Sequence, residues 1–132
     1  MSITQTVQEA KRYGVFGCDR YTTLCNAARR MVEENISSLV VVDEDGYLAG
    51  IITRTDLMRL AITITDWEIH PVKNFMIAPV VTVPPEATLA QVAELMLKKQ
   101  IHRIVVVRDE GGRQRPLSVV SDADILYHMV NG

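Results

Sequence analysis

Two copies of a Ser/Thr-x-x-Asp motif carry the residue types best suited to ligand chemistry in this 132-residue sequence. Residues 53–56 (Thr-Arg-Thr-Asp) form the first copy, and residues 121–124 (Ser-Asp-Ala-Asp) form the second. An ionised aspartate accepts hydrogen bonds through two oxygens and donates none, so it suits a ligand with adjacent hydroxyl donors. A hydroxyl side chain beside the unpaired N–H groups of a helix start favours an anion. Each motif therefore has groups suited to a polar ligand, and taken alone its spacing fits a helix capping box equally well.

A basic pair provides a second candidate group. His102 and Arg103 precede 104–107, a run of β-branched residues typical of a strand that is buried on both faces. An arginine at the head of such a strand can form two charge-assisted hydrogen bonds to a phosphate. The similar stretch 36–42 has Ser37-Ser38 at the corresponding place, so we expect the charge at only one of the two strands.

Both motifs and the basic pair fall within an internal repeat. A shift of 65 residues places 15–42 on 80–107 with nine identities in 28 positions, where average composition gives about two. Beyond the following turn the offset becomes 68, which aligns 51–57 with 119–125. One repeat alone buries too little surface to be comfortably stable. We therefore expect two repeats packed about a pseudo-twofold axis, with equivalent clefts appearing twice.

Each repeat is expected to read strand, helix, strand, turn, strand, helix. Apolar residues at i, i+3, i+4 and i+7 predict a helix from Leu24, with one of the threonines Thr22 and Thr23 as N-cap and Asn35 as its end. A crossover helix makes the first two strands parallel, and a tight turn makes the next pair antiparallel. The remaining expectations for the chain are a short N-terminal helix within 1–13, strands at 14–19, 36–42 and 47–53, a second helix to about 61, a connector over 62–74, and a turn over 109–116 in the second repeat.

Composition narrows the class of protein. The sequence is 48% hydrophobic but only 5% aromatic, and its net charge is −2, which gives no electrostatic footprint for nucleic acid or an anionic membrane. No apolar run is long enough for a transmembrane helix, and residues 1–11 lack the apolar core of a signal peptide. Cys18 and Cys25 fit neither a disulfide framework nor a structural zinc site. We expect a soluble cytoplasmic protein with reduced thiols.

The order of these elements resembles the CBS domain pair, also called a Bateman module. The resemblance rests on Phe75-Met76 with 79–83, on the valine-rich strands, and on the closing elements 50–56 and 119–124. It implies an α/β fold of two tandem β-α-β-β-α repeats, with repeat 1 at 10–66 and repeat 2 at 72–130. Repeat 1 departs from the family pattern at its start, where Gly-Val-Phe-Gly-Cys (14–18) replaces the usual Pro-Val-x-x-Val.

Such pairs are similar to sensors of adenine nucleotides. The resemblance implies a stand-alone regulatory module that binds AMP, or ADP or ATP, in inter-repeat clefts and signals to an unknown protein partner. S-adenosyl-methionine is an alternative ligand. No catalytic residue, metal or cofactor is implied. The residues implied as ligand contacts are Asp56 and Asp124 for a ribose, Thr53 and Ser121 beside them, Arg103 and His102 for a phosphate, and Ile36, Ser37, Ser38, Arg54 and Ile101 around the base and the rest of the ligand.

The two clefts are not expected to be equal. The cleft with Asp124 combines Ser121 with the basic pair 102–103, and adenine would lie against 36–38 of the other repeat. The cleft with Asp56 has Thr53 and Arg54, with 101–103 nearby. We favour the Asp124 cleft because the charge of Arg103 suits a phosphate.

Other interpretations stay open for the same residues. Each Ser/Thr-x-x-Asp motif also fits a helix capping box, with Asp in place of Glu or Gln. Arg103 is alternatively a surface arginine that is solvated or paired with Asp122, and His102 an exposed residue.

Two further hypotheses concern the whole chain. The first alternative to a nucleotide-binding module is a structural homodimerisation module with degenerate pockets. It is suggested by the later helix of each repeat, which has more apolar residues than one small core can bury. An enzyme is the weakest, because the sequence has no nucleophile–base set, metal-ligand cluster or glycine-rich phosphate loop. The apolar residues behind the homodimerisation hypothesis are Leu57, Leu60, Ile125, Leu126 and Met129.

Overall fold

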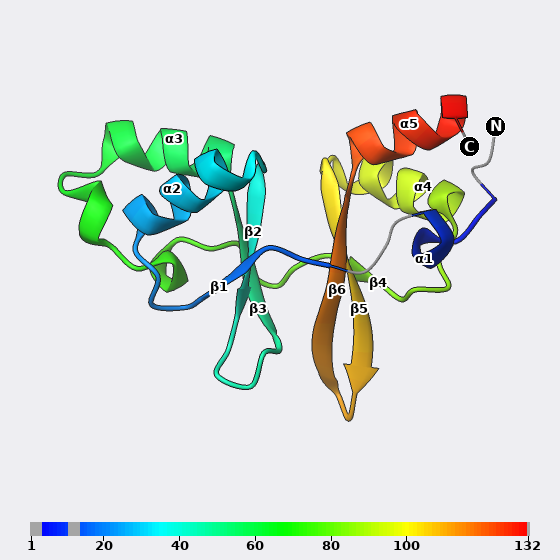
Figure 1. The fold of residues 1–132 in the computed structure, drawn as a ribbon, viewed down its shortest axis with the longest axis horizontal. Helices are drawn as coiled ribbons and strands as arrows, with labels where there is room; N and C mark the ends of the chain where they lie inside the picture. Colours follow the sequence, from blue (N-terminus) through cyan, green and yellow to red (C-terminus); the bar gives the residue numbers. More distant parts are fainter. Residues whose placement is uncertain (1–3, 11–13, 132) are drawn as a thin grey trace. The chain divides into compact units, whose positions relative to one another are not determined.

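The computed structural model describes residues 4–10 and 14–131, and its element order repeats strand, helix, strand, strand, helix (Figure 1). Repeat 1 contains β1 (Gly17–Asp19), α2 (Leu24–Glu34), β2 (Ser38–Val42), β3 (Leu48–Thr53) and α3 (Arg54–Thr63). Repeat 2 contains β4 (Thr82–Val83), α4 (Leu89–Lys99), β5 (Arg103–Glu110), β6 (Arg113–Ser121) and α5 (Asp122–Asn131). A short helix, α1 (Val7–Ala10), precedes them, and the 3₁₀ turns η1 (Trp67–Ile69) and η2 (Val72–Asn74) lie in the connector. The predicted α/β class is confirmed.

Each repeat forms a three-stranded sheet in sequence order, β1-β2-β3 and β4-β5-β6. The first pair of strands is parallel and the second antiparallel in both sheets, as the crossover helices and tight turns predict. Register shifts occur at Val41/Val42 and at Val106/Val107, which are 65 residues apart. The two sheets thus have the same strand order and the same irregularity of hydrogen-bond register at equivalent positions.

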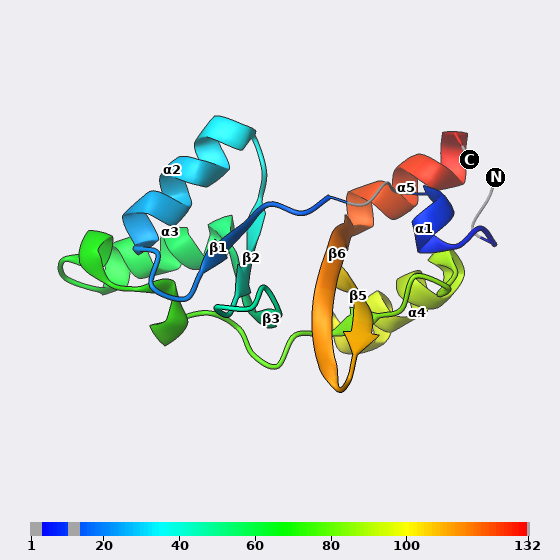
Figure 2. The ribbon, with the colours of Figure 1, turned by 60° about the horizontal axis from the view of Figure 1, so that its bottom comes forward.

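Two helices cover one face of each sheet. Figures 1 and 2 show α2 and α3 on the same side of β1–β3, and α4 and α5 on the same side of β4–β6. The first core joins Leu24 and Met31 of α2 with Leu39 of β2, Ile52 of β3 and Leu57 of α3. The second core uses the equivalent elements of repeat 2.

The valine-rich strands are buried on both faces, as predicted. Leu39 and Val41 contribute to the core under the helices, whereas the alternating Val40 is also 0% exposed. In repeat 2 the corresponding Ile104 contributes to that core, and the alternating Val105 is likewise 0% exposed. Side chains alternate between the faces of a strand, so burial of neighbours requires cover on both faces.

Helix starts and ends follow from single residues. Thr23 is the N-cap of α2 and accepts a hydrogen bond from the backbone of Asn26. Asn35 ends α2 in the left-handed conformation with φ of 52°, which asparagine tolerates better than most residues. In repeat 2, Thr88 and Gln91 form a capping box at the start of α4. The predicted cap and stop of α2 are confirmed.

The N-terminal segment belongs to the same compact unit as repeat 2. The chain divides into residues 16–80 and a second unit that joins residues 81–132 to the segment before Phe16. The backbone N–H of Val7 donates to the carbonyl of Ala87 (2.8 Å), and that of Leu89 donates to Gln5 (3.0 Å). Val7 is fully buried in the core of this unit. The expected N-terminal helix is therefore present as α1, and residues 11–13 of that expectation lie outside the described residues.

One turn was predicted wrongly. The sequence indicated a turn over 109–116, but β5 and β6 continue their pairing to Glu110 and Arg113, and Gly111 and Gly112 alone connect them. Both glycines have positive φ, which a two-residue hairpin turn requires. Pro116 does not end the strand because β6 is an edge strand and Pro116 lies at the register shift, where a missing N–H is tolerated.

Candidate functional site

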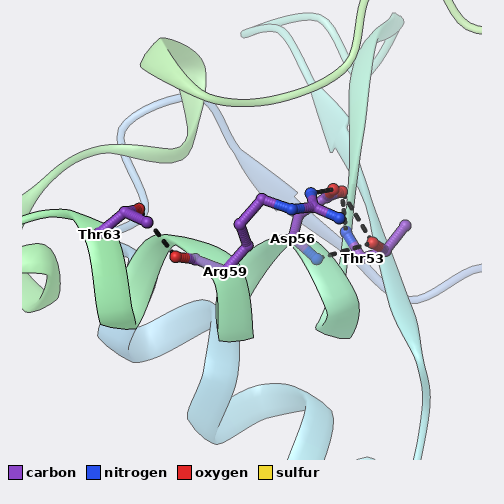
Figure 3. Close-up of polar contacts among 4 residues, drawn as sticks. All are labelled: Thr53, Asp56, Arg59 and Thr63. Carbon is purple, nitrogen blue, oxygen red and sulfur yellow. Dashed lines mark hydrogen bonds and ion pairs between the residues drawn. The ribbon is translucent and has the colours of Figure 1, made fainter.

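The first Ser/Thr-x-x-Asp motif forms a capping box at the start of α3 (Figure 3). Oδ2 of Asp56 accepts hydrogen bonds from the hydroxyl (2.7 Å) and backbone N–H (3.2 Å) of Thr53. The backbone N–H of Asp56 donates in return to the Thr53 hydroxyl at 3.2 Å. Its other carboxylate oxygen, Oδ1, lies 3.3 Å from Nη1 of Arg59. Both oxygens of this carboxylate thus have partners within α3 and its cap.

The second motif repeats this geometry at the start of α5. Oδ2 of Asp124 accepts from the backbone N–H of Ser121 at 2.8 Å and from its hydroxyl at 3.2 Å. The backbone N–H of Asp124 donates to the Ser121 hydroxyl at 3.2 Å. The residue three positions later is Tyr127, so α5 has no arginine where α3 has Arg59. The capping interpretation is confirmed for both motifs, and capping leaves their role towards a ligand open because a carboxylate has about four acceptor sites.

Each motif lies directly beside the head of a valine-rich strand. Ser38 pairs with Thr53 across β2 and β3, and Arg103 pairs with Ser121 across β5 and β6. The backbone N–H of Arg54 donates to the carbonyl of Ser37 at 2.9 Å. The corresponding bond in repeat 2 runs from Asp122 to His102, also at 2.9 Å. The structure therefore brings together, within each repeat, the groups that the sequence singled out separately.

The two strand heads differ in charge. In repeat 2, Arg103 is half-buried beside Ser121, and Nδ1 of His102 lies 3.2 Å from Oδ2 of Asp122. The His102 side chain is 76% exposed, which agrees with the interpretation of an exposed residue. In repeat 1 the same places are held by Ser37 and Ser38. Whether these groups bind a ligand, and whether a site takes residues from both repeats, stays a prediction.

Ile36 and Ile101 were predicted to lie against a base, and each lines an apolar groove between the two helices of its own repeat. The repeat-1 groove has a volume of about 390 Å³ and the repeat-2 groove about 540 Å³. Every residue that lines the repeat-1 groove has its equivalent in the repeat-2 groove. The equivalent pairs are Ala28/Ala93, Met31/Met96, Val32/Leu97, Asn35/Gln100, Ile36/Ile101, Arg54/Asp122, Leu57/Ile125 and Met58/Leu126.

The part of the chain that the structure describes has neither a metal-binding cluster nor a membrane-spanning helix. Residues 4–10 and 14–131 contain no group of three His, Cys, Asp or Glu side chains that could hold a metal ion. None of the helices in these ranges is long and apolar enough to cross a membrane. Both cysteines are free thiols, and burial raises the pKa of Cys18, with Asp19 acting in the same direction.

Sequence reasoning missed two partners of the predicted residues. Arg59 pairs with Asp56, and the (i, i+3) spacing of opposite charges on a helix is a signal that could have found it. The contact of Nδ1 of His102 with Oδ2 of Asp122 joins two residues that are 20 positions apart in the sequence, so no local spacing reveals it.

A family model describes most of the chain. The model for the CBS domain matches residues 6–63 and again residues 72–131. The 5'-AMP-activated protein kinase subunit gamma-3 of Sus scrofa is 33% identical over 106 residues, which is 75% of this chain. The chain spans 20% of that subunit, and between 20% and 53% of the first three curated relatives that it matches.

Solved structures share the fold over nearly the whole chain. The CBS domain of a CBS domain-containing membrane protein from Sphaerobacter thermophilus is 28% identical, with a TM-score of 0.79, covering 95% of this chain and 88% of that one. The CBS domain pair of protein MJ0100, solved with 5-methylthioadenosine and S-adenosyl-L-methionine, has a TM-score of 0.84 at 24% identity and covers 97% of this chain and 98% of that one. With two matches of the family model in tandem and the element order of these structures, the chain belongs to the CBS domain family and contains a pair of CBS domains.

Proposed function

We propose that this CBS pair is a regulatory module that binds an adenine nucleotide, with AMP as the simplest ligand, and passes its occupancy to a protein partner. The observation that carries the proposal is the duplicated Ser/Thr-x-x-Asp motif, held beside a strand head in both repeats. A relative is named as a subunit of an AMP-activated kinase, and a structural neighbour was solved with two adenosyl compounds. These two similarities support an adenosine compound as the class of ligand, but they do not identify the ligand of this chain.

The proposed contacts follow from hydrogen-bond chemistry. A ribose presents two neighbouring hydroxyl donors, and a carboxylate fixed by its own helix cap is an acceptor in a constant position. Asp124 is held in this way by three hydrogen bonds with Ser121. Arg103, which pairs with Ser121 across the sheet, supplies a cation for a phosphate. The same position in repeat 1 is Ser38, which offers no charge.

The charge at the two strand heads supports the Asp124 site as the stronger one. Arg103 pairs with Ser121 beside Asp124, and its cation suits a phosphate. The same position beside Asp56 is Ser38, which has no charge. We therefore propose that Asp124 contributes more to nucleotide affinity than Asp56 does.

A thermal-stability panel tests the proposal. AMP, ADP, ATP, S-adenosyl-methionine and NAD are each added to the full chain, with adenine-free GMP as the control. A ligand present at 100 times its Kd stabilises the folded state by about 2.7 kcal/mol, which raises Tm by several degrees. We expect at least one adenosine compound to do so, and the recovered nucleotide to be chemically unchanged. No shift with any of them would refute the nucleotide proposal, and turnover would show an enzyme instead.

A second function, homodimerisation through the later helix of each repeat, is favoured by a separate observation. Large apolar side chains remain exposed on α3 and α5 although both helices also contribute to their cores. Exposed apolar surface of this kind commonly marks a protein interface. The exposed residues are Met58 and Ile62 on α3, and Leu126, Met129 and Val130 on α5. A monomer by light scattering at micromolar concentration would contradict this function, whatever the nucleotide panel shows.

A further inference from the structure

The hairpin of β5 and β6 gathers arginines on one of its faces. Arg108 of β5 lies directly opposite Arg115 of β6. Two positions nearer the turn, Glu110 lies opposite Arg113. Opposed residues, and residues two apart on one strand, have side chains on the same face of a sheet. This surface, which we call the arginine face, therefore has three guanidinium groups and one carboxylate, a net charge of +2 in a chain whose net charge is −2.

A single carboxylate lies between two of these arginines. Oε2 of Glu110 is 3.0 Å from Nε of Arg108, and its Oε1 is 3.2 Å from Nη2 of Arg115. The two arginine side chains are 57% and 34% exposed. Like charges directly opposite each other destabilise a sheet, and Glu110 can neutralise only one of the three cations. A local arrangement that the fold alone does not favour is expected where it serves a function.

The other face of the hairpin holds it in place. Gln114 donates from Nε2 to the hydroxyl of Thr82 in β4 at 3.2 Å. Oδ1 of Asp109 accepts the backbone N–H of Gly112 at 2.8 Å, which fixes the turn. Figure 1 shows this turn at the end of the hairpin away from α5. The arginines are therefore presented on an anchored ribbon, which lowers the cost of ordering them when a partner binds.

Repeat 1 shows that joining the two strands does not require the arginine face. There, Oδ1 of Asp43 accepts the backbone N–H groups of Asp45 at 2.9 Å and Tyr47 at 3.0 Å, which closes a shorter turn. Residues 43–45 of that turn are all acidic. The offset between the repeats rises from 65 to 68 across the two turns, so the hairpin of repeat 2 is three residues longer. The arginine face is thus particular to repeat 2.

We propose that the arginine face is a docking surface for an extended acidic segment of a partner protein. Guanidinium groups form bidentate pairs with carboxylates. Arg113 and Arg115 are two positions apart on β6, so they match carboxylates two positions apart on an extended segment, which rises by about 3.3 Å per residue. An acidic peptide fits better than nucleic acid, which requires a wider basic surface than this chain of net charge −2 offers. The inference rests on the proposed function in one respect, that a regulatory module acts on a protein partner.

Fluorescence anisotropy with a labelled peptide of alternating glutamate and serine tests this surface. The full chain is added at about 20 mM and at about 150 mM salt, with a glutamine–serine peptide of the same length as control. We expect the glutamate peptide to bind and the glutamine peptide not to bind. The affinity should fall as salt rises, because exposed ion pairs are screened.

Arg113→Glu is the decisive variant, and Arg29→Glu on α2 is its matched control. Both arginines are exposed, and both substitutions change the net charge equally. We expect Arg113→Glu to raise the Kd for the peptide about tenfold and Arg29→Glu to change it less than about twofold. Arg113→Gln, which places no second carboxylate opposite Glu110, should raise it about threefold. Glu110→Gln should lower the Kd, because it removes the carboxylate that competes with the peptide.

Three results would overturn the inference. The first is no binding of the glutamate peptide at about 1 mM wild-type protein in low salt. The second is an equal loss in Arg113→Glu and Arg29→Glu, which would indicate attraction by overall charge. The third is tighter binding of a single-stranded oligonucleotide of equal charge, which would assign the face to nucleic acid. AMP binding is measured on the same samples, and none of its proposed contacts lies on the arginine face, so failure of either proposal is seen separately.

Discussion

Asp124 has two roles that different substitutions can separate. Its carboxylate caps α5 through Ser121, and in our proposal it also binds a ribose. The chain itself shows which residue keeps the cap without the charge, because Gln91 completes the capping box of α4 with Thr88. Asp124→Gln is therefore a better probe of binding than Asp124→Ala, which removes cap and charge together.

The cap itself makes a prediction about stability. Asp124→Ala loses the reciprocal hydrogen bonds and the favourable charge at the helix start, and should lower the free energy of unfolding by about 1.5 kcal/mol. Asp124→Gln should lose only the charge, at a cost of about 0.5 kcal/mol. Urea denaturation of both variants measures the difference. Equal losses for alanine and glutamine would show that the side-chain cap contributes nothing.

At the scale of the elements, the packing of β3 requires that residue 50 has no side chain. The segment between η2 and β4 runs beside this strand, where the N–H groups of Ile51 and Ile77 donate to each other's carbonyls at 3.1 and 2.9 Å. A Cβ on Gly50 would lie 2.5 Å from Sδ of Met76 and 3.0 Å from the carbonyl oxygen of Ile77. The methionine side chain can move, but the backbone oxygen is held by the hydrogen bond from Ile51.

We therefore expect Gly50→Ala to lower the free energy of unfolding by about 1–3 kcal/mol, as overpacking in a core does. Thermal denaturation measures the loss. Gly17→Ala is the milder comparison, because its added Cβ would meet one carbonyl oxygen, that of Val40, at 3.1 Å. A Gly50 variant as stable as the wild type would mean that the segment between η2 and β4 is free to move away from β3.

Local sequence signals predicted most elements because they act within a few residues. The threonine cap of α2, the stop at Asn35 and both valine-rich strands were predicted correctly from composition and spacing. The hairpin of β5 and β6 was predicted too short, because charged residues and Pro116 suggested a loop where an edge strand tolerates both. The docking of the N-terminal segment on repeat 2 joins Val7 to Ala87, and no local pattern predicts a contact across 80 residues of sequence.

For the whole chain, the repeat was the strongest information in the sequence, and its departures from symmetry were the most useful. The shared positions predicted the two sheets and their helices, which the structure confirms. The positions that differ, such as Ser38 against Arg103, support the proposed difference in ligand affinity between the two repeats. The equivalence of the two grooves required the structure, because their lining residues come from two helices and the loop that follows the first.

Calorimetric titration of AMP into the full chain, the Asp124→Gln variant and the matched Asp56→Gln variant is the most direct test of the proposed function. We expect the wild type to bind, Asp124→Gln to bind at least about tenfold more weakly, and Asp56→Gln to lose less, because repeat 1 has Ser38 where repeat 2 has Arg103 for a phosphate. Both variants should unfold within about 0.5 kcal/mol of the wild type, which separates binding from folding. Wild-type affinity retained by Asp124→Gln, or no binding of AMP by the wild type, would contradict nucleotide binding at Asp124.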